Sequence, residues 1–143
     1  MSNATIDLLN VADITNWHSE HDLLVVGFGA AGACAAIESA QAGNTVLVLE
    51  RGSGIGGTTS LATGHFYLGG GTRVQLANGI EDSADEMFNY LMANTPNPDA
   101  EKIRAYADDS VSHFNWLVEQ GVPFNDGFYE KKHYEQPTDE CLI

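Results

Sequence analysis

The feature that most constrains the fold of this chain is a glycine-rich turn between two short apolar runs. Residues 23–26 are continuously apolar, and residues 27–32 read Gly-Phe-Gly-Ala-Ala-Gly. An alanine-rich stretch over 30–42 follows, Gly43 ends it, and a second apolar run covers 45–49. Continuous apolar runs are typical of strands buried on both faces of a sheet, and an alanine-rich stretch favours a helix. The pattern predicts parallel strands joined by a right-handed helical crossover, and therefore an α/β fold.

The turn has the spacing of a phosphate-binding loop, because Gly27, Gly29 and Gly32 match G-x-G-x-x-G between a predicted strand and a predicted helix. Gly27 allows a tight turn, Gly29 lets a pyrophosphate approach the backbone, and Gly32 lets the helix pack closely on the strand. The helix N-terminus adds N–H groups without intrahelical partners and a partial positive charge. The candidate phosphate-binding residues are therefore Gly27, Gly29, Ala30, Ala31 and Gly32.

An acidic residue closes the second apolar run. Glu50 stands where a Rossmann-like βαβ unit places the carboxylate that accepts hydrogen bonds from an adenosine ribose. A purely structural turn is disfavoured, because turn, helix, spacing and acid all agree. Both NAD and FAD contain such a ribose, so these features alone leave the two cofactors open.

The segment after the second run separates the two cofactors. Residues 50–72, "ERGSGIGGTTSLATGHFYLGGGT", are too rich in glycine for a regular element and predict an extended loop. This segment resembles the stretch after the second strand in the fumarate reductase and 3-oxosteroid dehydrogenase flavoproteins, where it runs along the pyrophosphate towards the flavin ring. The resemblance implies an FAD site. It leaves open a 3-oxosteroid dehydrogenase-like and a fumarate- or urocanate-reductase-like enzyme, and the residues of "GGTT…YLGGGT" favour the first. The residues that it assigns to the cofactor are Glu50, Arg51, Gly56, Gly57, Thr58, Thr59, Ser60, Thr63 and Gly64.

Capping patterns predict helices in the second half of the chain. Thr72 with Gln75, and Ser83 with Glu86, have the spacing of capping boxes, and Asp99 precedes a longer helix that reaches to about residue 120. The apolar stripe of that helix predicts core packing and consists of Ile103, Tyr106, Val111, Phe114, Leu117 and Val118. The segment that begins at Thr72 could be a short strand or a short helix, and its capping box favours a helix. The predicted architecture is thus a Rossmann-like FAD-binding βαβ unit followed by a glycine-rich loop, this short element and two helices.

The resemblance also divides the chain. We expect a leader over residues 1–20, the N-terminal part of an FAD-binding domain over 21–124, and the start of a connection to a missing substrate or cap domain over 125–143. Residues 115–124, "NWLVEQGVPF", resemble the helix end that precedes this connection in the family. The fold is therefore expected to be an incomplete part of a larger one, with apolar faces left uncovered.

The implied function is that of a flavin-dependent oxidoreductase acting on CH–CH bonds next to a carbonyl, on a small-molecule substrate held by the missing domain. In the family the catalytic acid/base lies far downstream, so no catalytic residue is predicted in this chain. Two alternatives stay open, an NAD-binding dehydrogenase domain and a non-catalytic nucleotide-binding fragment. The substrate, the direction of reaction and any electron-transfer partner are left open as well.

Composition excludes several other classes of function. The net charge of −14 argues against nucleic acid and anionic membrane as partners. No apolar run reaches the length of a membrane span, and the polar N-terminus lacks the features of a signal peptide, so a cytoplasmic location is expected. The five histidines are scattered without metal-ligand spacing, and Cys34 is expected to pack as a small buried residue.

Overall fold

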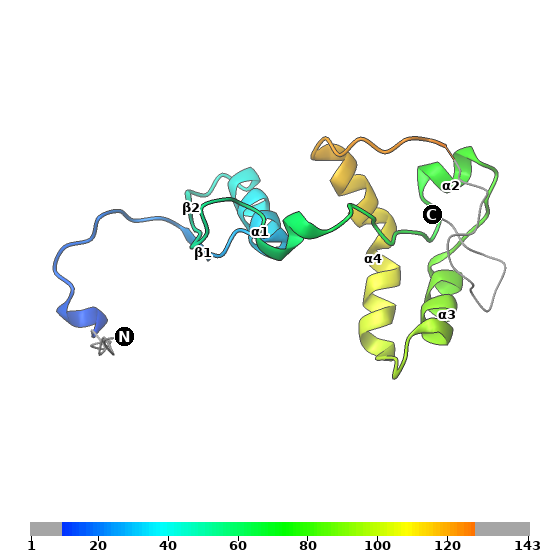
Figure 1. The fold of residues 1–143 in the computed structure, drawn as a ribbon, viewed down its shortest axis with the longest axis horizontal. Helices are drawn as coiled ribbons and strands as arrows, with labels where there is room; N and C mark the ends of the chain where they lie inside the picture. The colour runs from blue at the N-terminus through cyan, green and yellow to red at the C-terminus, as the bar shows by residue number, and fades with distance from the viewer. Residues whose placement is uncertain (1–9, 128–143) are drawn as a thin grey trace. The chain divides into compact units, whose positions relative to one another are not determined.

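The computed structural model describes residues 10–127, which divide into two units (Figure 1). The first unit extends to Gly64 and the second begins at His65. The expected leader over 1–20 and the expected connection over 125–143 lie partly outside the described residues. The expected division of the chain into domains therefore stays a prediction.

The first unit has the predicted βαβ arrangement. After a short 3-10 helix, η1 (Val11–Asp13), it consists of β1 (Leu23–Val26), α1 (Ala30–Gln41) and β2 (Val46–Leu49). The two strands are parallel, in a register that runs from Leu23 opposite Val46 to Val26 opposite Leu49. Gly43 has φ +88°, which explains why the helix ends there. The prediction of an α/β crossover is confirmed, with strand and helix bounds within a residue or so of those expected.

A carboxylate fixes the amino ends of the two strands. Asp22 accepts hydrogen bonds from the Thr45 N–H group at 2.8 Å and from the Thr45 hydroxyl at 2.7 Å. These hydrogen bonds hold the pKa of the Asp22 carboxyl below its usual value. The strands are therefore joined by side-chain as well as ladder hydrogen bonds before the sheet begins.

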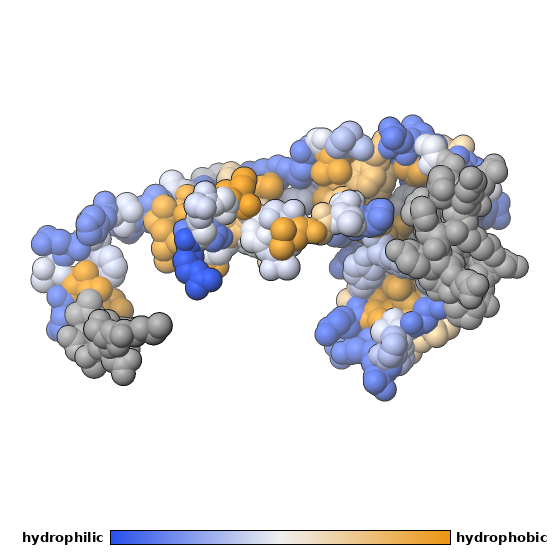
Figure 2. All heavy atoms as spheres, viewed as in Figure 1, coloured by the Kyte–Doolittle hydropathy of each residue, from blue (hydrophilic) through white to orange (hydrophobic). Residues whose placement is uncertain are grey.

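The prediction of strands buried on both faces is wrong for this chain. Val25 is 7% exposed and faces α1, whereas Leu24 is 54% and Val26 81% exposed. The physical reason is that α1 packs on one face of the two-stranded sheet, and alternate strand residues point to the opposite face. Figure 2 shows apolar residues at the surface of this unit. Cys34, expected to be buried, is exposed on α1, which contains no buried residue.

The second unit is helical. It contains α2 (Arg73–Ala77), α3 (Ala84–Asn94) and α4 (Ala100–Glu119), and α3 packs against α4 as an antiparallel pair (Figure 1). The capping box of Thr72 and Gln75 is formed, and the side chains of Ser83 and Asp99 accept hydrogen bonds at the starts of the other two helices. The predicted helix starts are confirmed.

The core of this unit includes two small residues that the apolar stripe did not indicate. Ala107 and Ser110 are each 1% exposed, beside the predicted Phe114 and Leu117. The small side chains of Ala107 and Ser110 leave room for the backbone at Gly69 to lie close to α4. There the Gly69 N–H group donates a hydrogen bond to the Ser110 hydroxyl at 2.9 Å. The predicted apolar stripe is therefore partly confirmed, since Phe114 and Leu117 are buried. The hydrogen bond between Ser110 and Gly69 was not predicted.

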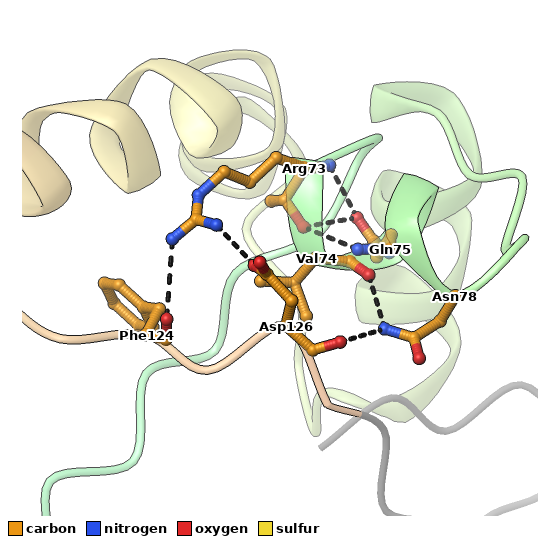
Figure 3. A network of polar contacts seen from close by, with 7 residues as sticks. Arg73, Val74, Gln75, Asn78, Phe124 and Asp126 are labelled. Carbon is orange, nitrogen blue, oxygen red and sulfur yellow. Dashed lines mark hydrogen bonds and ion pairs between the residues drawn. The ribbon is translucent and has the colours of Figure 1, made fainter.

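Polar contacts hold the glycine segment and the end of the described chain to α2 (Figure 3). Gln75, 4% exposed, accepts hydrogen bonds from the backbone of Gly71 and Thr72 and donates to Asp82 at 2.6 Å. Arg73 forms an ion pair with Asp126, and Asn78 donates to the Asp126 carbonyl at 2.9 Å. This half of the chain is thus organised by its own buried polar groups.

Candidate nucleotide-binding site

The glycine turn has the geometry that its spacing predicts. Gly27 has φ +96°, a conformation that side chains strain, and its N–H group donates to the Leu49 carbonyl at 2.7 Å. A Cβ atom on Gly32 would lie 2.1 Å from the Gly27 carbonyl oxygen and 3.1 Å from a methyl group of Val25. Gly32 is therefore the point where α1 meets both the turn and β1. The turn is bound to both strands before any ligand is considered.

The N-terminus of α1 offers donors for an anion. Gly29 is the N-cap and supplies no side-chain acceptor, while the Ala30 N–H group donates to the Thr59 hydroxyl at 3.1 Å. The N–H groups of Ala31 and Gly32 have no acceptor among residues 10–127. A Cβ atom at Gly29 would make only ordinary contacts, with the Thr59 hydroxyl oxygen at 3.7 Å and the Gly56 carbonyl oxygen at 3.8 Å. Free donors, the helix dipole and the absence of a side chain at Gly29 fit a phosphate group.

Glu50 has backbone partners that the sequence did not reveal. Its carboxylate accepts hydrogen bonds from the Phe28 N–H group at 2.8 Å and from the Gly52 N–H group at 2.7 Å. These two hydrogen bonds, the Gly52 one first, lower the pKa of the carboxyl. The carboxylate therefore lies beside the turn at the carboxyl end of both strands, where a ribose next to the pyrophosphate would be bound.

The glycine-rich segment over residues 50–72 was expected to be an extended loop, and part of it is instead helical. Residues Gly57–Leu61 form a short 3-10 helix, η2, which follows Gly56 at φ +100°. The Gly56 N–H group donates to the Phe28 carbonyl at 2.8 Å, and the Ser60 hydroxyl donates to the Gly57 carbonyl at 2.7 Å. Hydrogen bonds with the distant glycine turn stabilise η2, although the glycine content of its sequence disfavours a helix.

The structure brings most of the predicted residues together. The turn, the start of α1, Glu50 and η2 are joined by the hydrogen bonds just described. The Arg51 side chain is exposed and forms no hydrogen bond or ion pair within residues 10–127. Thr63 and Gly64 follow η2 in an exposed irregular segment that ends the first unit. For every one of the predicted site residues, a contact with the cofactor stays a prediction.

The described residues contain neither a metal site nor a membrane-spanning helix. In the part of the chain that the structure describes, no group of three His, Cys, Asp or Glu side chains could hold a metal ion. No helix within that part is long and apolar enough to cross a membrane. The hydrogen-bonded arrangement of the glycine turn, the start of α1, Glu50 and η2 is the candidate site, and its donors and carboxylate suit a dinucleotide.

Comparison with known proteins defines the family. The model of the FAD binding domain family matches residues 22–138. Vinyl phenol reductase from Lactiplantibacillus plantarum is 37% identical over 108 residues, which cover 75% of this chain and 22% of the relative. The crystal structure of 3-ketosteroid-delta4-(5alpha)-dehydrogenase from Rhodococcus jostii RHA1, in complex with 4-androstene-3,17-dione, is 49% identical with a TM-score of 0.78. It is matched over 91% of this chain and 27% of its own.

A flavocytochrome c3 fumarate reductase is similar at 26% identity and a TM-score of 0.65, covering 76% of this chain and 19% of that one. The fold and the site define a dinucleotide-binding βαβ unit. The chain belongs to the FAD binding domain family, whose cofactor is FAD, so the predictions of the family and of FAD rather than NAD are confirmed. The chain spans about a quarter or less of the length of these relatives.

Proposed function

We propose that this chain forms the nucleotide end of the FAD site in a flavin-dependent oxidoreductase that acts on CH–CH bonds next to a carbonyl. One observation carries the proposal: the free N–H groups of α1, the Glu50 carboxylate and η2 meet at the carboxyl end of the parallel strands. This is the edge at which open α/β sheets bind their ligands.

Each part of the site has a proposed role. The Ala31 and Gly32 N–H groups bind the pyrophosphate, and Gly29 leaves its approach open. Glu50 accepts hydrogen bonds from the adenosine ribose, and the hydroxyls of Thr58, Thr59 and Ser60 line the path along the phosphates towards the flavin. The bound flavin supplies hydride transfer, while these residues bind and orient it.

The proposed reaction rests on the relatives. One is a ketosteroid dehydrogenase bound to a dione, a second is a fumarate reductase and a third a vinyl phenol reductase. The dione bound to the first and the fumarate in the name of the second each have a carbonyl or carboxyl group beside a carbon–carbon bond. We place substrate binding and the catalytic acid/base outside this chain, in keeping with the small share of the relatives that it covers.

A cofactor titration tests the binding role. We would titrate the purified chain with FAD and with NAD, following flavin fluorescence and heat, and identify any nucleotide that denaturation releases. The Gly29→Val variant is expected to lose FAD binding because its branched side chain blocks the backbone. Gly29→Ala is the matched control for folding, since its Cβ atom meets only ordinary protein contacts at 3.7 Å and beyond, and its smaller side chain is expected to weaken FAD binding less. Unchanged FAD binding by Gly29→Val would refute the assigned pyrophosphate position.

A further inference from the structure

Resting on the proposed FAD site, we propose that Glu50 is a positioning residue for the glycine turn as well as a ribose ligand. Its carboxylate holds the turn in the shape that a pyrophosphate requires before the nucleotide arrives. The inference differs from the ribose role, because it assigns to Glu50 an effect on the phosphate end of the ligand.

The peptide groups around Phe28 are held from two sides. The Phe28 N–H group donates to the Glu50 carboxylate at 2.8 Å, and the Phe28 carbonyl accepts a hydrogen bond from the Gly56 N–H group at 2.8 Å. Phe28 lies between Gly27 and Gly29, two residues that leave the backbone free to take other conformations. Without these two hydrogen bonds the central residue of the turn would have few constraints. Glu50 therefore restricts the backbone at Phe28, between the two flexible glycines.

The second oxygen of the carboxylate anchors this contact to the strand. It accepts a hydrogen bond at 2.7 Å from the N–H group of Gly52, three residues after the end of β2. The carboxylate thus bridges the exit of β2 to the exit of β1. An ionised carboxylate has about four acceptor positions, so two amide donors leave room for the two ribose hydroxyls. The positioning role and the ribose role are compatible in one side chain.

A matched carboxylate lies at the other end of the same strands. Asp22 accepts hydrogen bonds from the N–H and hydroxyl groups of Thr45, and it bridges the amino ends of β1 and β2. Both carboxylates are exposed, and both have a pKa below the usual value because of their hydrogen bonds. Asp22 is remote from the turn along the strand, so it controls for a general loosening of the sheet.

The test combines two ligands with three forms of the chain. ADP contains the ribose diol, and 2′,3′-dideoxy-ADP lacks it while keeping both phosphates. Their affinities would be measured by calorimetry on the unaltered chain, on Glu50→Gln and on Asp22→Asn. A glutamine can accept from only one of the two amides, so we expect Glu50→Gln to bind dideoxy-ADP weaker by on the order of tenfold. Asp22→Asn is expected to bind it with nearly unchanged affinity.

Two results would overturn the inference. Unchanged affinity of Glu50→Gln for dideoxy-ADP, with weaker binding of ADP, would leave Glu50 as a ribose ligand alone. An equal loss in Asp22→Asn would show that loosening the sheet suffices.

Amide hydrogen exchange without nucleotide gives an independent measurement. We expect the Phe28 and Gly52 amides to exchange faster in Glu50→Gln than in the unaltered chain, while α1 keeps its protection. Exchange rates at these two amides that are the same in Glu50→Gln and the unaltered chain would contradict the positioning role. If the unaltered chain binds neither ADP nor FAD, the proposed function fails, and the exchange measurement still decides the positioning role.

Discussion

Replacing Gly32 by alanine tests the account of the turn most severely within the fold. The added Cβ atom would lie 2.1 Å from the Gly27 carbonyl oxygen, and real Cβ atoms essentially never approach closer than 3.0 Å. The shortfall of roughly 0.9 Å (3.0 minus 2.1) falls on backbone, which cannot rotate away as a flexible side chain does. Relief requires α1 to move off β1 or the turn to change shape.

The magnitude follows from the atoms involved. Overpacking of a well-packed site costs about 1–3 kcal/mol, and a clash with backbone belongs at the upper end of that range. We therefore expect Gly32→Ala to lower the free energy of unfolding by about 3 kcal/mol, measured by urea denaturation with circular dichroism. FAD binding should be lost with it, because the same movement displaces the free N–H groups of α1.

The control lies three residues away in the same motif. Gly29→Ala places its Cβ atom 3.7 Å from the Thr59 hydroxyl oxygen, an ordinary contact, and Gly29 has φ −81°. Its unfolding free energy should stay within about 1 kcal/mol of the unaltered chain. If Gly32→Ala unfolds at the same urea concentration as Gly29→Ala, the close helix–strand contact described here is wrong.

Three further predictions follow from single contacts. The pKa of Asp22 is lowered in the folded state, so the unfolded chain binds more protons in acid. The contribution of Asp22 to the free energy of unfolding should therefore be full above about pH 4 and be lost as the pH falls below it. Urea titration at several pH values should show a smaller acid-induced loss in Asp22→Asn than in the unaltered chain. Ser110→Ala should cost about 1–3 kcal/mol of unfolding free energy by leaving a buried N–H group unpaired, whereas Ser112→Ala, on the exposed face, should change little; equal values would contradict the buried contact. Thr59→Val should lower the free energy of unfolding by about 1 kcal/mol and speed amide exchange at Ala30, because the Ala30 N–H group loses its acceptor. Thr59→Ser keeps a hydroxyl and should restore both quantities. No difference between the two variants would argue against the Ala30–Thr59 hydrogen bond.

Local sequence patterns predicted the elements well where the cause of each element is local. The apolar run of β1, the cap at Asp99 and the capping box at Thr72 all act within a few residues, and each was placed correctly. The glycines of the turn were also predictable, because their spacing reflects contacts within one βαβ unit. A single sequence is sufficient for features of this kind.

Features that depend on distant contacts were missed. The helix η2 depends on two hydrogen bonds with residues about thirty positions earlier in the chain: the Phe28 carbonyl accepts one from the Gly56 N–H group, and the Ala30 N–H group donates one to the Thr59 hydroxyl. Glycine content alone predicts no helix there. The amide partners of Glu50 and the burial of Ser110 likewise need the tertiary fold. Exposure of alternate residues on β1 was missed because a continuous apolar run indicates two covered faces, and α1 covers only one.

The most direct test of the central claim is a titration of the isotope-labelled chain with FAD, followed by amide chemical shifts. We expect the largest shifts on residues 27–32, on Gly52 beside Glu50 and on η2, and smaller shifts with NAD at the same concentration. Shifts confined to the helical second unit, or a stronger response to NAD than to FAD, would contradict the assignment of the FAD site to the glycine turn.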